Sequence, residues 1–157
     1  CEPKLLIADE PTTALDVTVQ AQVLDLLASL QRDHGLAMLF ITHDLSVLTH
    51  ACRRLAVMYA GRIVETGLGV DVFRDPQHPY SRALAGAFPT IGDPASRLRP
   101  SGLAGDPPDP SALPTGCPFH PRCAVAVDAC RTTDVRLLPV GSASSEASAA
   151  CVHVETR

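Results

Sequence analysis

A short apolar segment that ends in two adjacent acids constrains this chain more than any other feature. Leu5 to Ala8 is apolar, Asp9 and Glu10 follow, and Pro11 comes next. So short an apolar run is typical of a strand buried on both faces, as in a parallel sheet. Proline cannot donate to the ladder, so the strand should end there. The acids then lie at the strand's carboxyl end, where open α/β sheets place ligands. Asp9 could hold a metal ion and Glu10 could take a proton from water; the alternative is a plain polar strand end.

An amphipathic helix and a second strand are predicted next. The helix shows one apolar face, made of Val19, Val23, Leu26, Leu27 and Leu30. Asp16 is suited to cap its amino end and Gly35 to end it. The apolar residues 36–41 predict another buried strand, and His43 lies just beyond its carboxyl end. Taken alone, His43 can be an ordinary solvated turn residue, and Asp44 can cap a short helix over residues 45–51.

The remaining chain divides into a hairpin, short helices and an irregular end. Residues 53–59 and 62–67 are predicted to be strands joined by a turn at Ala60-Gly61. A short helix is expected at residues 70–73, and the segment DPQHPYSRAL (75–84) can be a proline-broken helix start. Residues 92–116 are rich in proline, glycine and serine, which predicts a loop or linker.

Together these segments resemble the ATP-binding subunits of ABC transporters. LLIADEPTTALD is similar to their Walker B strand and D-loop, His43 to their switch histidine, and VMYAGRIVETG to their closing hairpin. HPYSRAL is similar to a segment that marks the oligopeptide/dipeptide importer branch. The resemblance implies an α/β fold. Residues 1–67 would be the C-terminal half of a P-loop-type ABC ATPase domain and 68–91 a helical extension. Residues 92–157 would be a proline-rich linker and a small irregular cysteine-rich tail.

Two nucleotide-gripping motifs of that family are missing from the sequence. Lys4 is the only lysine and does not follow a glycine run, so there is no Walker A loop of the form G-x-x-x-x-G-K. No Gly-Gly pair exists, so LSGGQ is absent as well. The chain has no initiator Met and opens just before a core strand, so we expect both motifs upstream in a longer protein. The alternative is an ATPase-incompetent truncated fragment that acts as a metal- or partner-binding module.

The resemblance also implies an activity and its residues: ATP hydrolysis that powers import of di- or oligopeptides. Asp9 would hold Mg²⁺, Glu10 would polarise the attacking water, and His43 would contact the γ-phosphate of ATP. Asp16 would reach across an ATPase dimer, in addition to its capping role. The fragment alone should be inactive.

The implied partners are a second ABC ATPase subunit, transmembrane permease subunits and, indirectly, an extracytoplasmic peptide-binding protein. The subunit would sit peripherally at the cytoplasmic face of the cell membrane. A net charge of −4 argues against a nucleic-acid partner. The longest apolar run near the middle, residues 36–41, is too short to span a bilayer, and no signal peptide is evident.

Four of the six cysteines cluster near the end of the sequence: Cys117, Cys123, Cys130 and Cys151. Without a secretion signal, such a cluster favours metal ligation over disulfides. Thiolates suit zinc or iron–sulfur clusters, and the lack of a closely spaced cysteine pair favours a cluster with four iron atoms. The region is also similar to the cysteine-bearing tail of peptide-importer ATPases, some of which carry a 4Fe-4S cluster.

Other interpretations of these cysteines stay open. Zn²⁺ is the alternative metal, with His120 or His153 as substitute ligands, although both histidines suit ordinary exposed positions. The cysteines can also be structural or paired in disulfides. Cys1 and Cys52 stand apart in the sequence and are expected to be inert.

Overall fold

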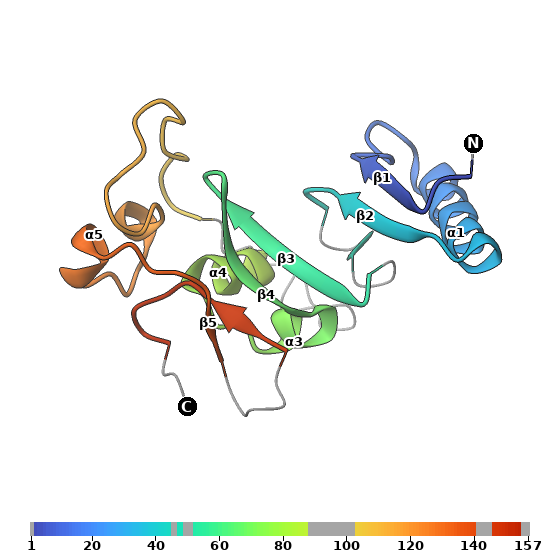
Figure 1. Ribbon diagram of the computed structural model, residues 1–157. Coiled ribbons are helices and arrows are strands. Elements are labelled where there is room, and N and C mark those ends of the chain that lie inside the picture. Colours follow the sequence, from blue (N-terminus) through green and yellow to red (C-terminus); the bar gives the residue numbers. More distant parts are fainter. Residues whose placement is uncertain (1, 45–46, 49–51, 88–102, 141–145, 155–157) are drawn as a thin grey trace. The chain divides into compact units, whose positions relative to one another are not determined.

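The computed structural model describes residues 2–44, 47–48, 52–87, 103–140 and 146–154 of a mixed α/β chain. The chain divides into two compact units, Cys1–Arg53 and Arg54–Arg157 (Figure 1). The predicted helix over 45–51 lies mostly outside the described residues, as do Cys1 and residues 92–102 of the predicted linker. No helix in the described ranges is both long and apolar enough to cross a membrane.

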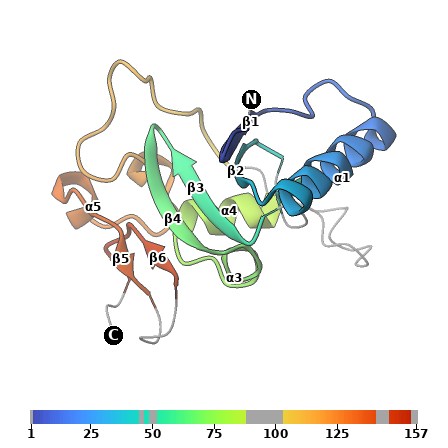
Figure 2. The same ribbon diagram turned by 45° about the vertical axis from the view of Figure 1, so that its right-hand side comes forward.

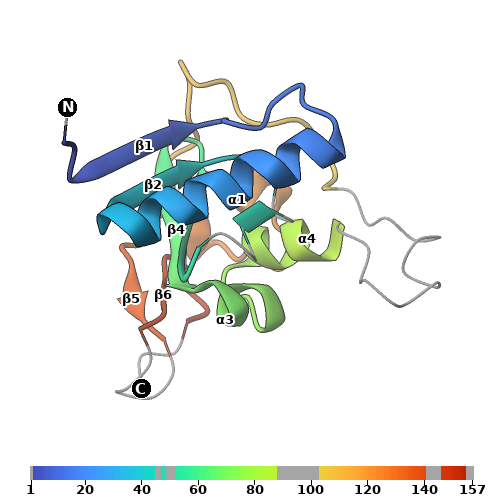
Figure 3. The same ribbon diagram turned by 90° about the vertical axis from the view of Figure 1, so that its right-hand side faces the viewer.

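The first unit is built on two parallel strands, β1 (Leu5–Asp9) and β2 (Ala37–Ile41). Their register runs from the Leu5–Ala37 pair to the Asp9–Ile41 pair. Helix α1 (Val17–His34) connects them and runs alongside the strand pair (Figure 3). The predicted order of strand, helix and strand is therefore confirmed, and the carboxyl ends of both strands lie at the same edge.

Both ends of α1 are fixed by the residues that the sequence indicates. The Oδ1 atom of Asp16 accepts hydrogen bonds from the backbone N–H groups of Thr18 and Val19, each at 3.0 Å. Gly35 ends the helix with a φ of 62°, in the left-handed region that glycine adopts at little cost. The capping interpretation of Asp16 is thus confirmed.

The prediction that β1 and β2 are buried on both faces is wrong for the described chain. Ile7 is 59% exposed and Leu39 is 50% exposed, and Leu5 and Ile41 lie on the same face. Successive side chains of a strand point to opposite faces, so these four form one apolar sheet face that no described element covers. The apolar stripe of α1 is likewise not buried, since Leu26 is 57% exposed.

The second unit begins with the predicted antiparallel hairpin of β3 (Arg54–Tyr59) and β4 (Arg62–Leu68). Ala60 and Gly61 join the strands with φ values of 48° and 76°. Positive φ at both central residues is the requirement of the tight turn that matches strand twist. The short helices α3 (Gly69–Arg74) and α4 (Pro79–Ala87) follow, so the helix predicted at residues 70–73 is confirmed.

The end of the chain is more ordered than the sequence indicates. Residues 103–119 form no helix or strand in the described structure. Beyond them lie η2 (His120–Arg122), α5 (Ala129–Thr132), β5 (Leu138–Pro139) and β6 (Ser148–Ala149). β6 pairs antiparallel with β4, so the sheet order is β3-β4-β6-β5 (Figure 2). The tail is thus part of the hairpin sheet.

An aromatic cluster forms the core of the second unit. The rings of Tyr59 and Tyr80 have centroids 4.7 Å apart, and Phe119 lies 5.2 Å from Tyr59 and 5.4 Å from Tyr80. Phe119 is only 2% exposed. Because these rings come from β3, α4 and the tail, their packing joins all three segments.

Candidate functional site

The carboxyl ends of β1 and β2 bring Glu10 and His43 into contact. The backbone N–H of Glu10 donates to the carbonyl of Ile41 at 2.9 Å, which holds Glu10 beside the end of β2. The Oε1 atom of Glu10 accepts the backbone N–H of His43 at 3.1 Å and lies 2.8 Å from His43 Nδ1. Thr13 Oγ1 donates to Oε2 at 3.0 Å. The carboxylate is therefore held at both oxygens.

The contact between Glu10 and His43 shifts the pKa of each side chain in the direction that favours its charged form. The hydrogen bond from His43 lowers the pKa of Glu10, and the same bond raises the pKa of His43. The charged pair therefore exists from the lowered pKa of the acid up to the raised pKa of the imidazole. The His43 side chain is 81% exposed, so solvent screening keeps the contribution to folding small.

The other two acids of the predicted site have different surroundings. Asp9 is the last residue of β1 and is exposed, one position before Glu10. Asp16 lies at the amino end of α1, where Oδ1 is engaged in capping. Glu10 itself has a φ of 48°, which is unusual for a residue with a side chain. Such backbone outliers cluster at functional sites.

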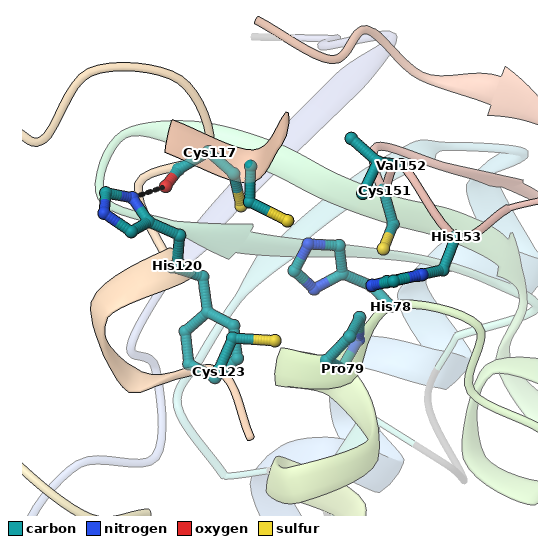
Figure 4. A pocket seen from close by; sticks show the side chains of 10 residues that line it. His78, Pro79, Cys117, His120, Cys123, Cys151, Val152 and His153 are labelled. Atoms are coloured by element: carbon teal, nitrogen blue, oxygen red, sulfur yellow. Dashed lines mark hydrogen bonds between the residues drawn. The ribbon is translucent and has the colours of Figure 1, made fainter. Parts of the chain in front are cut away.

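A second candidate site lies in the other unit, where the four clustered cysteines line one pocket (Figure 4). Cys117 and Cys123 flank η2, Cys130 lies in α5, and Cys151 comes two residues after β6. The backbone N–H of Cys117 donates to the carbonyl of Cys130 at 2.9 Å. Elements remote in sequence thus converge on the same small space.

Gly116 makes the approach of two of these cysteines feasible. Its φ is 70°, and a Cβ atom there would lie 2.4 Å from the carbonyl oxygen of Cys130. Any side chain would therefore combine a strained backbone with a clash against the α5 backbone. The glycine before Cys117 is a requirement of the pocket's geometry.

The environment of three pocket thiols raises their pKa values. Burial raises the pKa of Cys117, Cys123 and Cys151, and repulsion between the neighbouring cysteines adds to the effect. A metal would have to displace their protons, since the thiolate is the ligand.

The predicted metal site is not confirmed by the structure. Among the described residues, no group of three His, Cys, Asp or Glu side chains lies close enough to hold a metal ion as placed. His120 and His153 line the pocket, but each has a ring nitrogen on a backbone carbonyl, Cys117 at 2.9 Å and Val125 at 2.8 Å. Cys52 is partly buried, lies outside the pocket and has a pKa raised by burial.

Sequence reasoning missed the role of His78, which also lines the cysteine pocket. The residue is 1% exposed, and burial lowers its pKa to about 4, against a weaker opposing effect of the Ala150 carbonyl. Its backbone N–H and that of Gln77 donate to the two carboxylate oxygens of Glu65 at 2.9 and 2.8 Å. The HPY letters were visible in the sequence, but nothing there placed them beside the cysteines.

With this geometry in place, the chain can be compared with known proteins, and it is similar to ATP-binding proteins of peptide import. Residues 64–130 match the family described as "Oligopeptide/dipeptide transporter, C-terminal region". That match covers most of the hairpin strand β4, the HPY segment and three of the four pocket cysteines.

The similar proteins carry names that agree with this family. A putative peptide import ATP-binding protein of Brucella ovis is 46% identical over 98% of this chain and 46% of its own length. The dipeptide transport ATP-binding protein DppD of Haemophilus influenzae is 49% identical over 90% of this chain and 42% of its own length. The chain therefore spans about half the length of the curated relatives it matches.

A solved structure gives a weaker likeness. The cbiO1 protein of Clostridium perfringens, part of the ABC transporter complex cbiONQ, is 35% identical with a TM-score of 0.45. The match covers 47% of this chain and 30% of that chain.

Proposed function

We propose that this chain is the C-terminal part of an ATP-binding subunit that hydrolyses ATP to power import of di- or oligopeptides through an ABC transporter. The contact between Glu10 and His43 carries the proposal. It places a carboxylate and an imidazole together at the carboxyl ends of adjacent parallel strands, where α/β sheets bind ligands. Relatives that are 46–50% identical and named for peptide import support the choice of substrate.

The residues of the first unit suit the needs of phosphoryl transfer, which are positioning and charge neutralisation. Glu10, whose pKa the hydrogen bond from His43 lowers, is an ionised carboxylate at neutral pH and would polarise the attacking water. His43, whose pKa the same contact raises, would contact the γ-phosphate. Asp9 would hold Mg²⁺, most simply through water, since Mg²⁺ dehydrates reluctantly. MgATP would supply the transferred phosphoryl group, and Asp16 would couple two ATPase subunits.

The proposed assembly contains a second ATPase subunit and transmembrane permease subunits at the cytoplasmic face of the membrane. A peptide-binding protein on the other side would deliver the substrate. The acidic net charge of −4 supports a partner set without nucleic acid.

Uptake by the complete transporter tests the proposed function. Liposomes that contain the whole complex should accumulate labelled dipeptides or oligopeptides only when MgATP is present on the side of the ATP-binding subunit. The 157-residue chain alone should show no micromolar MgATP binding by calorimetry, because its sequence lacks the Walker A loop. ATP-driven uptake of nickel without peptide uptake would refute the substrate. Micromolar binding of MgATP by the chain alone would refute our inference that it lacks the motifs needed to bind the nucleotide.

We also propose that Cys117, Cys123, Cys130 and Cys151 together ligate one 4Fe-4S cluster, with Zn²⁺ as the alternative. The support is their convergence on one pocket. The bound cluster would staple a segment that has little apolar core.

Metal analysis of anaerobically purified protein tests the cluster. We expect brown protein with iron and sulfide in equal amounts, and loss of both on Cys117→Ser because a ligand is removed. Cys52→Ser is the matched control: it removes a thiol outside the pocket and should leave iron and sulfide unchanged. Zinc without sulfide would keep the ligands and discard the cluster. Disulfides among these cysteines in fresh protein would discard both.

A further inference from the structure

Three hydrogen-bond donors surround the carboxylate of Glu10. The Oε1 atom accepts the backbone N–H of His43 at 3.1 Å and lies 2.8 Å from His43 Nδ1. An ionised carboxylate has no proton to give, so Nδ1 is the donor of that contact. The Oε2 atom accepts the hydroxyl of Thr13 at 3.0 Å. The donors are therefore divided unequally between the two oxygens.

This division leaves one acceptor position of the carboxylate open. A carboxylate oxygen has about two lone-pair positions, and His43 occupies both of those on Oε1. Thr13 occupies one on Oε2, so the second position of Oε2 has no donor among the described residues. The Glu10 side chain is 36% exposed, so water can reach it. The oxygen that is free to accept a proton from water is therefore Oε2.

Thr13 is placed beside Glu10 by two successive tight turns of the backbone. The Thr13 backbone N–H donates to the Glu10 carbonyl at 3.2 Å, and the Leu15 N–H donates to the Thr12 carbonyl at 3.3 Å. Ala14 has a φ of 62° within these turns, and Thr12 is only 8% exposed. Hydrogen-bonded turns with a buried anchor leave Thr13 little freedom, so its hydroxyl stays within reach of Oε2.

We propose that Thr13 is a positioning residue for ATP hydrolysis, whose hydroxyl holds Glu10 with one lone pair of Oε2 directed at the attacking water. The inference rests on the proposed role of Glu10 as the group that polarises this water. In that reaction the water oxygen bonds to the γ-phosphorus, the bond from this phosphorus to ADP breaks, and a water proton passes to Oε2. Without the Thr13 donor, Oε2 has two open positions, and the water is held less often in the geometry that reacts.

Two substitutions in the complete ATP-binding protein separate the hydroxyl of Thr13 from the shape of the residue. Thr13→Val has the same shape and no hydroxyl, whereas Thr13→Ser keeps the hydroxyl. We expect Thr13→Val to lower kcat about 3- to 10-fold, the effect of one lost hydrogen bond. KM for MgATP should be unchanged, because the hydroxyl contacts Glu10. Thr13→Ser should stay within about twofold of the wild-type kcat.

A double-mutant cycle with Glu10→Gln shows whether Thr13 acts through Glu10. With the carboxylate already gone, Thr13→Val should cause no further loss of kcat, whereas a residue that only shapes the turn would lower kcat equally in both backgrounds. Thr18→Val is the matched control, because Thr18 is exposed on α1, and it should keep the wild-type rate. If denaturant unfolding shows that Thr13→Val is unstable, Thr13→Ala removes the same hydroxyl and must give the same loss and the same cycle.

The outcomes separate this inference from the proposed function. Suppose that Glu10→Gln lowers hydrolysis as expected, but Thr13→Val keeps the wild-type kcat or lowers it equally in both backgrounds. Thr13 then has no positioning role, and Glu10 remains the base. Hydrolysis by Glu10→Gln at the parent rate would instead overturn the role of Glu10 and this inference together.

Discussion

Glu10→Gln in the complete ATP-binding protein is expected to lower ATP hydrolysis by about 10²–10⁴-fold, the usual effect of removing a general base. ATP binding should persist, because the substitution preserves the shape of the site. The glutamine oxygen can still accept the His43 N–H in place of Oε1, and its amide nitrogen can face Thr13 Oγ1 in place of Oε2. Steady-state hydrolysis and calorimetric binding of ATP measure the two effects separately.

The titration of His43 provides an independent readout of the same substitution. The hydrogen bond that His43 donates to Glu10 raises the pKa of His43 above 6.5, so in Glu10→Gln the pKa should fall back toward that value. Glu2→Gln makes the same chemical change at an exposed position and should alter neither hydrolysis nor the titration. A lowered pKa of His43 with hydrolysis at the parent rate would confirm the contact and exclude Glu10 as the base.

Glu65→Ala should destabilise the second unit more than removal of an exposed carboxylate does. The change leaves the backbone N–H groups of Gln77 and His78 without their acceptors. Each buried N–H left unpaired costs about 1–3 kcal/mol, and Gln77 is partly exposed, so we expect a loss of about 2–4 kcal/mol. Glu65→Gln should cost less, because one oxygen remains to accept.

Denaturant unfolding and hydrogen exchange measure this loss. The amides of Gln77 and His78 should exchange faster in Glu65→Ala, well before the β3–β4 hairpin opens. Glu146→Ala is the matched control: it removes an exposed carboxylate paired with Arg54 in the same unit and should cost less than about 1 kcal/mol. Equal costs for the two alanine variants would show that the Glu65 clamp does not hold the segment.

Local chemistry made much of the first unit predictable. Strand β1 forms where the short apolar run precedes Asp9 and Glu10. Helix α1 begins after its cap at Asp16 and ends at Gly35, as the local sequence predicts. The contact between Glu10 and His43 follows from one further step, because the carboxyl ends of adjacent parallel strands share an edge. The exposure of Ile7 and Leu39 could not be foreseen, since burial depends on what covers a sheet face.

The cysteine pocket shows where such reasoning stops. The clustering of four cysteines in the sequence predicted that they lie together. The position of His78 beside them depends on tertiary contacts, which no short sequence pattern encodes. The strand β6 was missed for a related reason: Ser148 and Ala149 are small, lack alternation and have weak strand preference. Their pairing with Glu65 and Thr66 of β4 decides their conformation.

The pairing of β6 with β4 fixes the position of Cys151, whatever the length of chain between Cys151 and the other pocket cysteines. The backbone N–H of Ala150 donates to the Val64 carbonyl at 2.8 Å. Pairing with β4 therefore positions the next residue, Cys151, at the pocket. The irregular segment of residues 133–137, between α5 and β5, can then differ in length, since lengthening a loop costs little free energy. Relatives can therefore differ widely in that spacing and keep the same pocket. A search for this pocket should look for a cysteine two residues after a short strand of small residues, with HPY and a buried acid upstream.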